Sequence, residues 1–203
     1  MKQGLLQKLL SSPALYMASQ TLSGAKRARS FCVDNFVPKR PGLRVLDLGC
    51  GTGYVSAYFR DADYWGFDIS EPYIAYAKNK YGQYGQFFCQ DLNADVLDSF
   101  GKFDLVIMNG LLHHLNDDEV IDFMTIAKTA LLPTGKVLTL DGCYEPYQSR
   151  LAKKLLNSDR GKYVRFEDEY CRIVRKVFAQ VKSQLFRDLL YLPYTIIIIE
   201  CSN

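Results

Sequence analysis

Three glycines at alternate positions follow a short apolar run in the segment VLDLGCGTGY, residues 45–54. The run includes Asp47, and Gly49, Gly51 and Gly53 come shortly after it. A glycine-rich turn between a buried strand and a helix lets a ligand approach bare backbone and free amide groups. The alternative is a tight strand-to-helix turn without a ligand, but a plain turn rarely needs three alternating glycines. The segment therefore predicts a ligand site at the carboxyl end of a parallel strand.

The spacing of the glycines separates the ligand classes. Dinucleotide-binding loops read G-x-G-x-x-G, where the third glycine permits close packing beside a pyrophosphate. Here the spacing is G-x-G-x-G, Tyr54 follows, and the Gly-Lys-Ser/Thr of a P-loop is absent. An NAD-dependent Rossmann oxidoreductase stays as an alternative, because it shares the strand, the glycine loop and an acid about 20 residues further on.

The motif VLDLGCGTG resembles the first motif of the class I S-adenosylmethionine-dependent methyltransferases, and the resemblance covers residues 45–141. It implies that S-adenosylmethionine is the cofactor and that Asp47 lies near its amino-acid end. It also implies that Gly49, Gly51 and Gly53 pass under its methionine and ribose portions.

Further positions match this family. Asp68, in WGFDIS, would accept hydrogen bonds from both ribose hydroxyls, as a carboxylate can, and Ile69 would pack on the adenine. Asp91, in CQDLN, would accept from the adenine amino group, and Leu92 would supply the adjacent backbone amide. Asn109 would contact the cofactor through its backbone. Each acid taken alone also fits an ordinary turn.

The family places its methyl acceptor after the fourth strand, where this chain reads MNGLLHHL, residues 108–115. Members that methylate DNA bases or protein amides carry Asn/Asp-Pro-Pro-Tyr/Phe there, so those acceptors are disfavoured, and NGLLHHL resembles the small-molecule methyltransferases. His114 and His113 are the two histidines of the chain. An imidazole is a suitable base for a hydroxyl acceptor near neutral pH. His114 is preferred as the catalytic candidate, and the alternative is that either histidine only packs or forms hydrogen bonds.

Residues 150–187 carry eleven Lys or Arg residues against four Asp or Glu residues. Arg150, Arg160 and Arg165 could bind a phosphate or carboxylate through bidentate contacts. The favoured alternative is a solvated helix face, with leucines 151, 155 and 156 on the buried side. An RNA methyltransferase that uses this segment is a further alternative, although no basic motif of a known RNA module appears.

Five short apolar runs predict strands that are buried on both faces: residues 44–48, 64–67, 86–89, 103–108 and 136–140. Helical patterns separate them, which predicts right-handed crossovers and a parallel sheet. Residues 181–188 and 194–201 also read as strands, and the short connection between them requires antiparallel pairing. The fold class is therefore α/β: a Rossmann-like, doubly wound, seven-stranded sheet with an antiparallel C-terminal hairpin. The resemblance implies the strand order 3-2-1-4-5-7-6.

The helix signals are clear at two places. Ser70 precedes a predicted helix with Pro72 in its first turn, and Asn116 with Glu119 forms a capping-box pattern before a helix over 117–131. A helix is also expected after residue 54, and another over about 22–37. Together with an amphipathic leucine pattern over residues 5–10, these predict an N-terminal helical cap over residues 1–42. The whole chain, 1–203, is one predicted domain, in which 145–178 is a substrate-covering helical insertion.

Composition agrees with one globular domain, since 203 residues with 48% hydrophobic and 23% charged content suffice for one core. The six cysteines are isolated and form no C-x-x-C pair, which predicts no metal site and favours a reducing cytosol. The net charge of +3 is too small by itself to indicate nucleic acid. No targeting signal and no run long enough to span a bilayer appear, so a cytoplasmic protein without a membrane partner is expected.

The predicted function is methyl transfer to a small molecule at oxygen, with a sugar-like or anionic acceptor considered.

Overall fold

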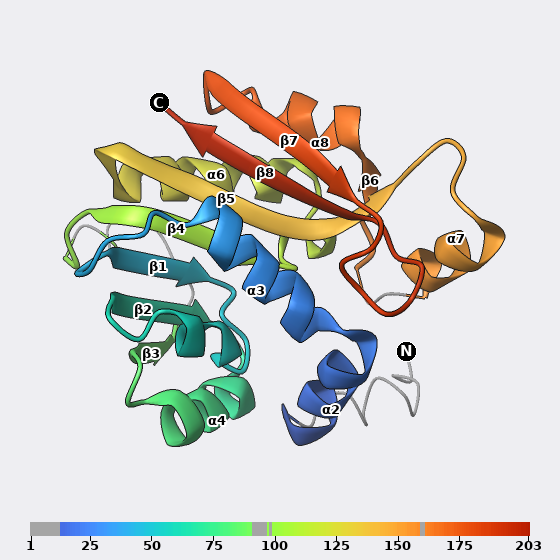
Figure 1. Cartoon of the computed structure of the whole chain (residues 1–203). Coiled ribbons are helices and arrows are strands. Elements are labelled where there is room, and N and C mark those ends of the chain that lie inside the picture. Colours follow the sequence, from blue (N-terminus) through green and yellow to red (C-terminus); the bar gives the residue numbers. More distant parts are fainter. Residues whose placement is uncertain (1–12, 91–96, 98, 159–160) are drawn as a thin grey trace.

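The computed structural model describes residues 13–90, 97, 99–158 and 161–203 of the chain. These residues form one mixed sheet of eight strands with helices on both faces (Figure 1). The strands are β1 (Arg44–Leu48), β2 (Asp63–Asp68), β3 (Gln86–Cys89), β4 (Phe103–Asn109), β5 (Leu131–Tyr144), β6 (Arg165–Phe166), β7 (Gln180–Phe186) and β8 (Ile196–Ser202).

The strand order is β3-β2-β1-β4-β5-β8-β7, and β6 pairs with the end of β5 outside this path. The first five strands are mutually parallel. β8 runs antiparallel to β7, because the residues between these two strands are too few for a crossover. β8 is also antiparallel to β5. The order predicted from the sequence is confirmed, with β7 and β8 as its sixth and seventh strands.

The helices are α2 (Pro13–Ser23), α3 (Ala25–Phe36), the 3-10 helix η1 (Tyr54–Tyr58), α4 (Glu71–Tyr81), the 3-10 helix η2 (Leu112–His114), α6 (Asp117–Ala130), α7 (Arg150–Asn157) and α8 (Glu167–Val174). α3 lies on one face of the sheet, and α6 and α8 lie on the other (Figure 1). Each face has its own core. Val120, Met124 and Ile173 pack on Leu46 and Val106 on one side.

On the other face, Ala28 and Phe36 of α3 pack with Val55 of η1 and Ile74 of α4. Strands β1, β4 and β5 contribute to both cores, which is why their sequences are apolar without alternation. The carboxyl ends of the parallel strands are left uncovered by these two layers. The loops that meet there determine what the protein can bind.

The structure corrects four local expectations. The helix after residue 54 is a single 3-10 segment of five residues, η1. The helix expected over about 22–37 is α3, which begins three residues later, because Gly24 adopts a left-handed φ of 85° and separates it from α2. β6 was not expected, since two residues carry no periodicity. Leu151, expected on the buried side of its helix, is 57% exposed, whereas Leu156 is buried as expected and Ala152 is buried beside it.

Helix α6 starts at the residue that the sequence predicts. The side chain of Asn116 accepts hydrogen bonds from the backbone amides of Asp118 and Glu119, and Glu119 accepts from the amide of Asn116. This reciprocal capping box satisfies amides that the helix cannot pair internally. It also fixes where the preceding segment, which contains both histidines, leaves the sheet.

Candidate active site

A cavity of about 460 Å³ runs along the carboxyl edge of the sheet. One side of it is lined by the ends of β2, β1, β4 and β5 and by the start of β8, in the order in which these strands lie side by side, and α2 and α3 line another side. Four inter-strand steps of about 4.8 Å give this row a width of about 19 Å. A larger, more open groove between α3 and the β7–β8 loop contains none of the predicted site residues. The cavity at the sheet edge is therefore the candidate site.

The glycine loop presents bare backbone to this cavity. Gly51 has a φ of 53°, and a Cβ placed on it would meet no atom closer than 3.9 Å, so its surroundings are open. Gly53 serves a different purpose, because a Cβ there would lie 2.7 Å from the Cβ of Ala77 and from the ring of Phe87. One glycine thus leaves room for a ligand, and the other lets the loop pack against α4 and β3.

Asp68 fixes the loop and faces the same cavity. Its Oδ2 accepts a hydrogen bond from the amide of Gly51 at 2.9 Å, and its Oδ1 accepts from the amide of Ser70 at 2.8 Å. Each carboxylate oxygen has a second lone pair for a ligand hydroxyl. Ile69 follows at the same edge and is 77% exposed. An exposed aliphatic side chain beside a carboxylate suits a flat ring attached to a sugar.

Asp47 lies deeper than the other predicted cofactor residues. It is fully buried, its Oδ2 accepts a hydrogen bond from the hydroxyl of Tyr64, and its Oδ1 has no partner among the described residues. Burial raises the pKa of Asp47 to about 7, although the hydrogen bond from Tyr64 acts in the opposite direction. Asp47 is not among the residues that line the cavity, so its buried side chain supports the glycine loop from the protein interior.

The predicted adenine contacts Asp91 and Leu92 lie outside the described residues. Asn109, at the end of β4, lines the cavity. The next residue, Gly110, donates its amide to the carbonyl of Leu140 at 2.7 Å, so the chain leaves β4 in contact with β5. The structure therefore brings Gly49, Gly51, Asp68 and Asn109 together around one cavity.

Both histidines also line this cavity, and they lie on the short helix η2. His113 is 7% exposed, and its Nδ1 lies 2.8 Å from Oδ1 of Asp141. The backbone amide of His113 donates to the same oxygen at 3.2 Å. His114 is exposed, and its ring centroid lies 4.3 Å from that of His113. The sequence places Asp141 after the fifth strand but does not identify it as the partner of His113.

The Asp141 carboxylate is 1% exposed, and its Oδ2 has no partner among the described residues. A buried carboxylate that accepts from Nδ1 fixes the orientation and tautomer of an imidazole and stabilises the imidazolium that forms on proton transfer. Contact with Asp141 thus fixes the orientation of the His113 ring at the cavity.

Elements from outside the parallel part of the sheet close both ends of the cavity. On the side of β1 and β2, α2 contributes Tyr16, whose ring lies 5.6 Å from that of Tyr73, and Thr52 of the glycine loop donates to the sulfur of Met17. On the side of β5 and β8, the lining is mostly apolar and comes from α7, the β7–β8 loop and the start of β8: Leu155, Leu190, Leu192, Tyr194 and Ile196.

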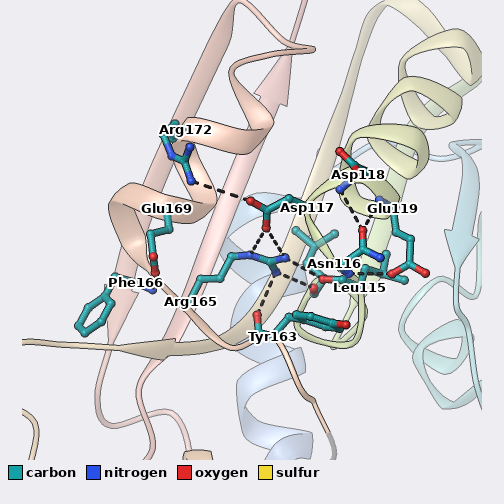
Figure 2. A network of polar contacts seen from close by, with 11 residues as sticks. Leu115, Asn116, Asp117, Asp118, Glu119, Tyr163, Arg165, Phe166, Glu169 and Arg172 are labelled. Atoms are coloured by element: carbon teal, nitrogen blue, oxygen red, sulfur yellow. Dashed lines mark hydrogen bonds and ion pairs between the residues drawn. The ribbon is translucent and has the colours of Figure 1, made fainter.

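Arg165 is not a free anion ligand. It is 6% exposed, and its guanidinium bonds to Asp117 and to backbone carbonyls around the histidine turn (Figure 2). Of the other two arginines considered from the sequence, Arg150 is exposed at the start of α7 and Arg160 lies outside the described residues. Within the described part of the chain, no group of three His, Cys, Asp or Glu side chains could hold a metal ion.

Comparison with known proteins agrees with this geometry. A family profile described as "Methyltransferase domain" matches residues 46–137. A malonyl-[acyl-carrier protein] O-methyltransferase from Bacillus cytotoxicus is 32% identical over 123 residues, which cover 57% of this chain and 42% of that protein. Relatives of the same name from Bacillus anthracis and Acetivibrio thermocellus are matched over 53% and 28% of their lengths. The chain thus spans about half or less of the curated relatives it matches first.

Solved structures share the fold. A TehB-like S-adenosylmethionine-dependent methyltransferase from Corynebacterium glutamicum superposes with a TM-score of 0.65 at 17% identity, covering 94% of this chain and 96% of that one. A phosphoethanolamine N-methyltransferase from Haemonchus contortus, in complex with S-adenosylhomocysteine, gives a TM-score of 0.73 at 15% identity, covering 98% and 59%. Among the helices of the described residues, none combines the length and apolar character needed to cross a bilayer.

Proposed function

We propose that this chain, which matches a methyltransferase-domain profile over residues 46–137 and shares the fold of S-adenosylmethionine-dependent methyltransferases, is a class I enzyme of that kind that transfers a methyl group to a hydroxyl of a small molecule. The observation that carries the proposal is the continuity of one cavity from Asp68 to the His113–Asp141 pair. A methyl donor held at one end would face a base at the middle of the same row of strands.

The residues at the β1–β2 end fit S-adenosylmethionine. The open backbone at Gly51 gives room for the methionine and ribose portions, and the second lone pairs of the Asp68 carboxylate suit the ribose diol. Ile69 supplies an exposed apolar surface for the adenine. When bound, the sulfonium supplies an activated methyl group, so the protein mainly has to align the acceptor and remove its proton.

His113 is proposed as that base. If Nδ1 carries its proton toward Asp141, Nε2 is the atom that accepts a proton from the acceptor hydroxyl. The negative charge of Asp141 then stabilises the imidazolium. His114, preferred from the sequence, lies exposed on the same turn and is proposed to contact the acceptor instead. The α2–α3 cap would cover the cofactor, and residues 145–178 would cover the acceptor.

The lining over β5 and β8 supports an acceptor with an apolar body. Leu155, Leu190, Leu192 and Ile196 form most of this end of the cavity. Arg165 is committed to internal contacts, which removes one of the three arginines that would favour a phosphate or a charged sugar. The name of the Bacillus relative, an O-methyltransferase, agrees with transfer to oxygen.

Isothermal titration with S-adenosylhomocysteine tests the cofactor half. Wild type should bind, and Asp68→Asn should bind at least about tenfold more weakly, since a charged hydrogen-bond acceptor contributes about 1.5–3 kcal/mol. Asp122→Asn, which removes an exposed acid from α6, is the matched control and should bind like wild type. Absence of binding by folded wild type, or equal binding by Asp68→Asn, would refute the proposal.

Formation of S-adenosylhomocysteine with a panel of alcohols, phenols and sugars tests the acceptor half. With any acceptor that is methylated, His113→Asn should lower kcat about 10²–10⁴-fold, which is the usual contribution of a general base. S-adenosylhomocysteine binding by this variant should stay near the wild-type value. An undiminished kcat would remove His113 from the mechanism.

A further inference from the structure

Arg165 is a buried cation whose donors are all used within the protein. A guanidinium has five N–H donors. Nε and Nη2 donate to Oδ1 of Asp117 at 3.1 and 2.8 Å, and Nη2 also donates to the carbonyl of Leu115 at 2.8 Å. Nη1 donates to the carbonyls of Leu112 and Tyr163 at 3.1 and 2.9 Å (Figure 2). These five contacts leave no donor for a ligand, so the function of Arg165 must be sought in what it holds.

Three of the four partners of Arg165 lie at the ends of the histidine turn. Leu112 is the first residue of η2, Leu115 follows its last residue, and Asp117 begins α6. η2 is one turn long and has few internal hydrogen bonds of its own: His114 N to Leu111 O and Leu115 N to Leu112 O. A turn this short depends on external partners for its position. Arg165 therefore fixes the backbone on both sides of His113 and His114.

The fourth partner of the guanidinium, Tyr163, belongs to the segment that lies over His113. The amide of Tyr163 donates to the carbonyl of His113 at 2.9 Å. Two residues earlier, a Cβ on Gly161 would lie only 2.0 Å from Cδ2 of the His113 ring and 2.7 Å from its carbonyl oxygen. Residues 161–165 thus contact both the ring and the backbone of His113, and Arg165 anchors this segment to the turn beneath it.

From this geometry we propose that Arg165 is a positioning residue for His113: it holds the segment 161–165 and the histidine turn together, so that the imidazole is fixed between Asp141 and the backbone at Gly161. The catalytic consequence rests on the proposed function. An apolar side chain could fill the same space without the cost of burying a charge. A contact that served packing alone would therefore not require an arginine at this position. The planar fork is suited to joining several backbone carbonyls and a carboxylate at once.

The chain has two histidines, which makes the imidazole signals a direct readout. In a long-range ¹H–¹⁵N spectrum of the full chain, His114→Gln identifies the signal of His113. Arg165→Lys keeps the charge but has three donors on one atom, so it cannot make the same five contacts. We expect it to shift the His113 ring signals and to reduce the Nδ1-protonated tautomer, while the affinity for S-adenosylhomocysteine stays within about twofold of wild type.

Arg172→Lys is the matched control. Arg172 lies on α8 and reaches the other oxygen of Asp117 at 3.9 Å, is largely exposed, and has no described contact with the histidine turn. This variant should leave the His113 signals at their wild-type positions. Gly161→Ala tests the same proposal from the other side of the ring: the added methyl group must displace the imidazole, so the His113 signals should shift although Arg165 is intact.

Kinetics with a methylated acceptor should show a lower kcat for Arg165→Lys and Gly161→Ala with an unchanged KM for S-adenosylmethionine. If Arg165→Lys does not fold, Asp117→Asn, which removes the carboxylate charge that the guanidinium pairs with, takes its place and should shift the His113 signals in the same way. Unshifted His113 signals in a folded variant of either kind would overturn the proposal. Shifted signals in a protein that binds no S-adenosylhomocysteine would support the positioning contact and refute the proposed function.

Discussion

The buried carboxyl of Asp47 should make the stability of the protein depend on pH in a defined direction. Its pKa rises from 3.8 to about 7 because burial disfavours the charged form. Between these two values the unfolded chain has lost a proton that the folded protein still holds. The free energy of unfolding therefore falls as the pH rises from about 4 to about 7, and this contribution levels off above that range.

The size of the effect follows from the shift. One pKa unit corresponds to about 1.4 kcal/mol, so the full shift destabilises the folded state at high pH by about 4 kcal/mol. About 2.5 kcal/mol of this appears between pH 5 and pH 8. Asp47→Asn has no proton to lose, and its amide can still meet the Tyr64 hydroxyl. The stability of this variant relative to wild type should therefore rise by about 2.5 kcal/mol from pH 5 to pH 8.

Urea unfolding of wild type, Asp47→Asn and the surface control Asp122→Asn at the two pH values measures this difference. The control should follow wild type, because Asp122 is exposed on the surface of α6. Tyr64→Phe should extend the fall in stability to higher pH, since it removes the hydrogen bond that lowers the pKa of Asp47. Parallel curves for wild type and Asp47→Asn would show that Asp47 is already ionised at pH 5, and the argument from burial would fail.

Three further variants or reagents test single features of the fold. Asn116→Ala should lower the free energy of unfolding by about 1 kcal/mol in urea titration, because it removes the side-chain half of the capping box; no change would mean that α6 does not depend on this cap. Gly53→Ala should be destabilised by at least about 1–3 kcal/mol in the same assay, since its φ is 71° and its new Cβ would collide with Ala77. A thiol reagent should modify Cys89 first, because the other five cysteines are buried free thiols; fast modification of two or more cysteines, mapped by mass spectrometry, would contradict this.

Much of the architecture follows from local patterns in the sequence. The apolar runs, the glycine loop and the short link between the last two strands suffice for the sheet and its antiparallel hairpin. The capping box at Asn116 is equally local, since its residues are three apart. These features were predictable because the residues that decide them are close together in the chain.

The parts that could not be predicted depend on contacts between distant residues. The pairing of His113 with Asp141 joins positions 28 residues apart. Arg165 reads as a possible anion ligand from its charge alone, but most of its partners are backbone carbonyls, which have no signature in a sequence. The pairing of β6 with β5 and the placement of Gly161 on His113 likewise join residues that are distant in the sequence. The start of the helix expected over about 22–37 differs for a local reason, since the left-handed conformation of Gly24 ends α2 and lets α3 begin at Ala25.

The position of β8 in the sheet has a consequence for biosynthesis. β8 is the last strand in sequence, yet it lies between β5 and β7, and its first residue, Ile196, lines the apolar end of the cavity. On the ribosome, the residues of the cofactor end, from Gly49 to Leu111, emerge long before it. A nascent chain can therefore shape the pocket for the methyl donor while the edge of β5 is still unpaired and prone to association with other strands. The apolar end of the cavity is completed only when residues 196–202 are inserted.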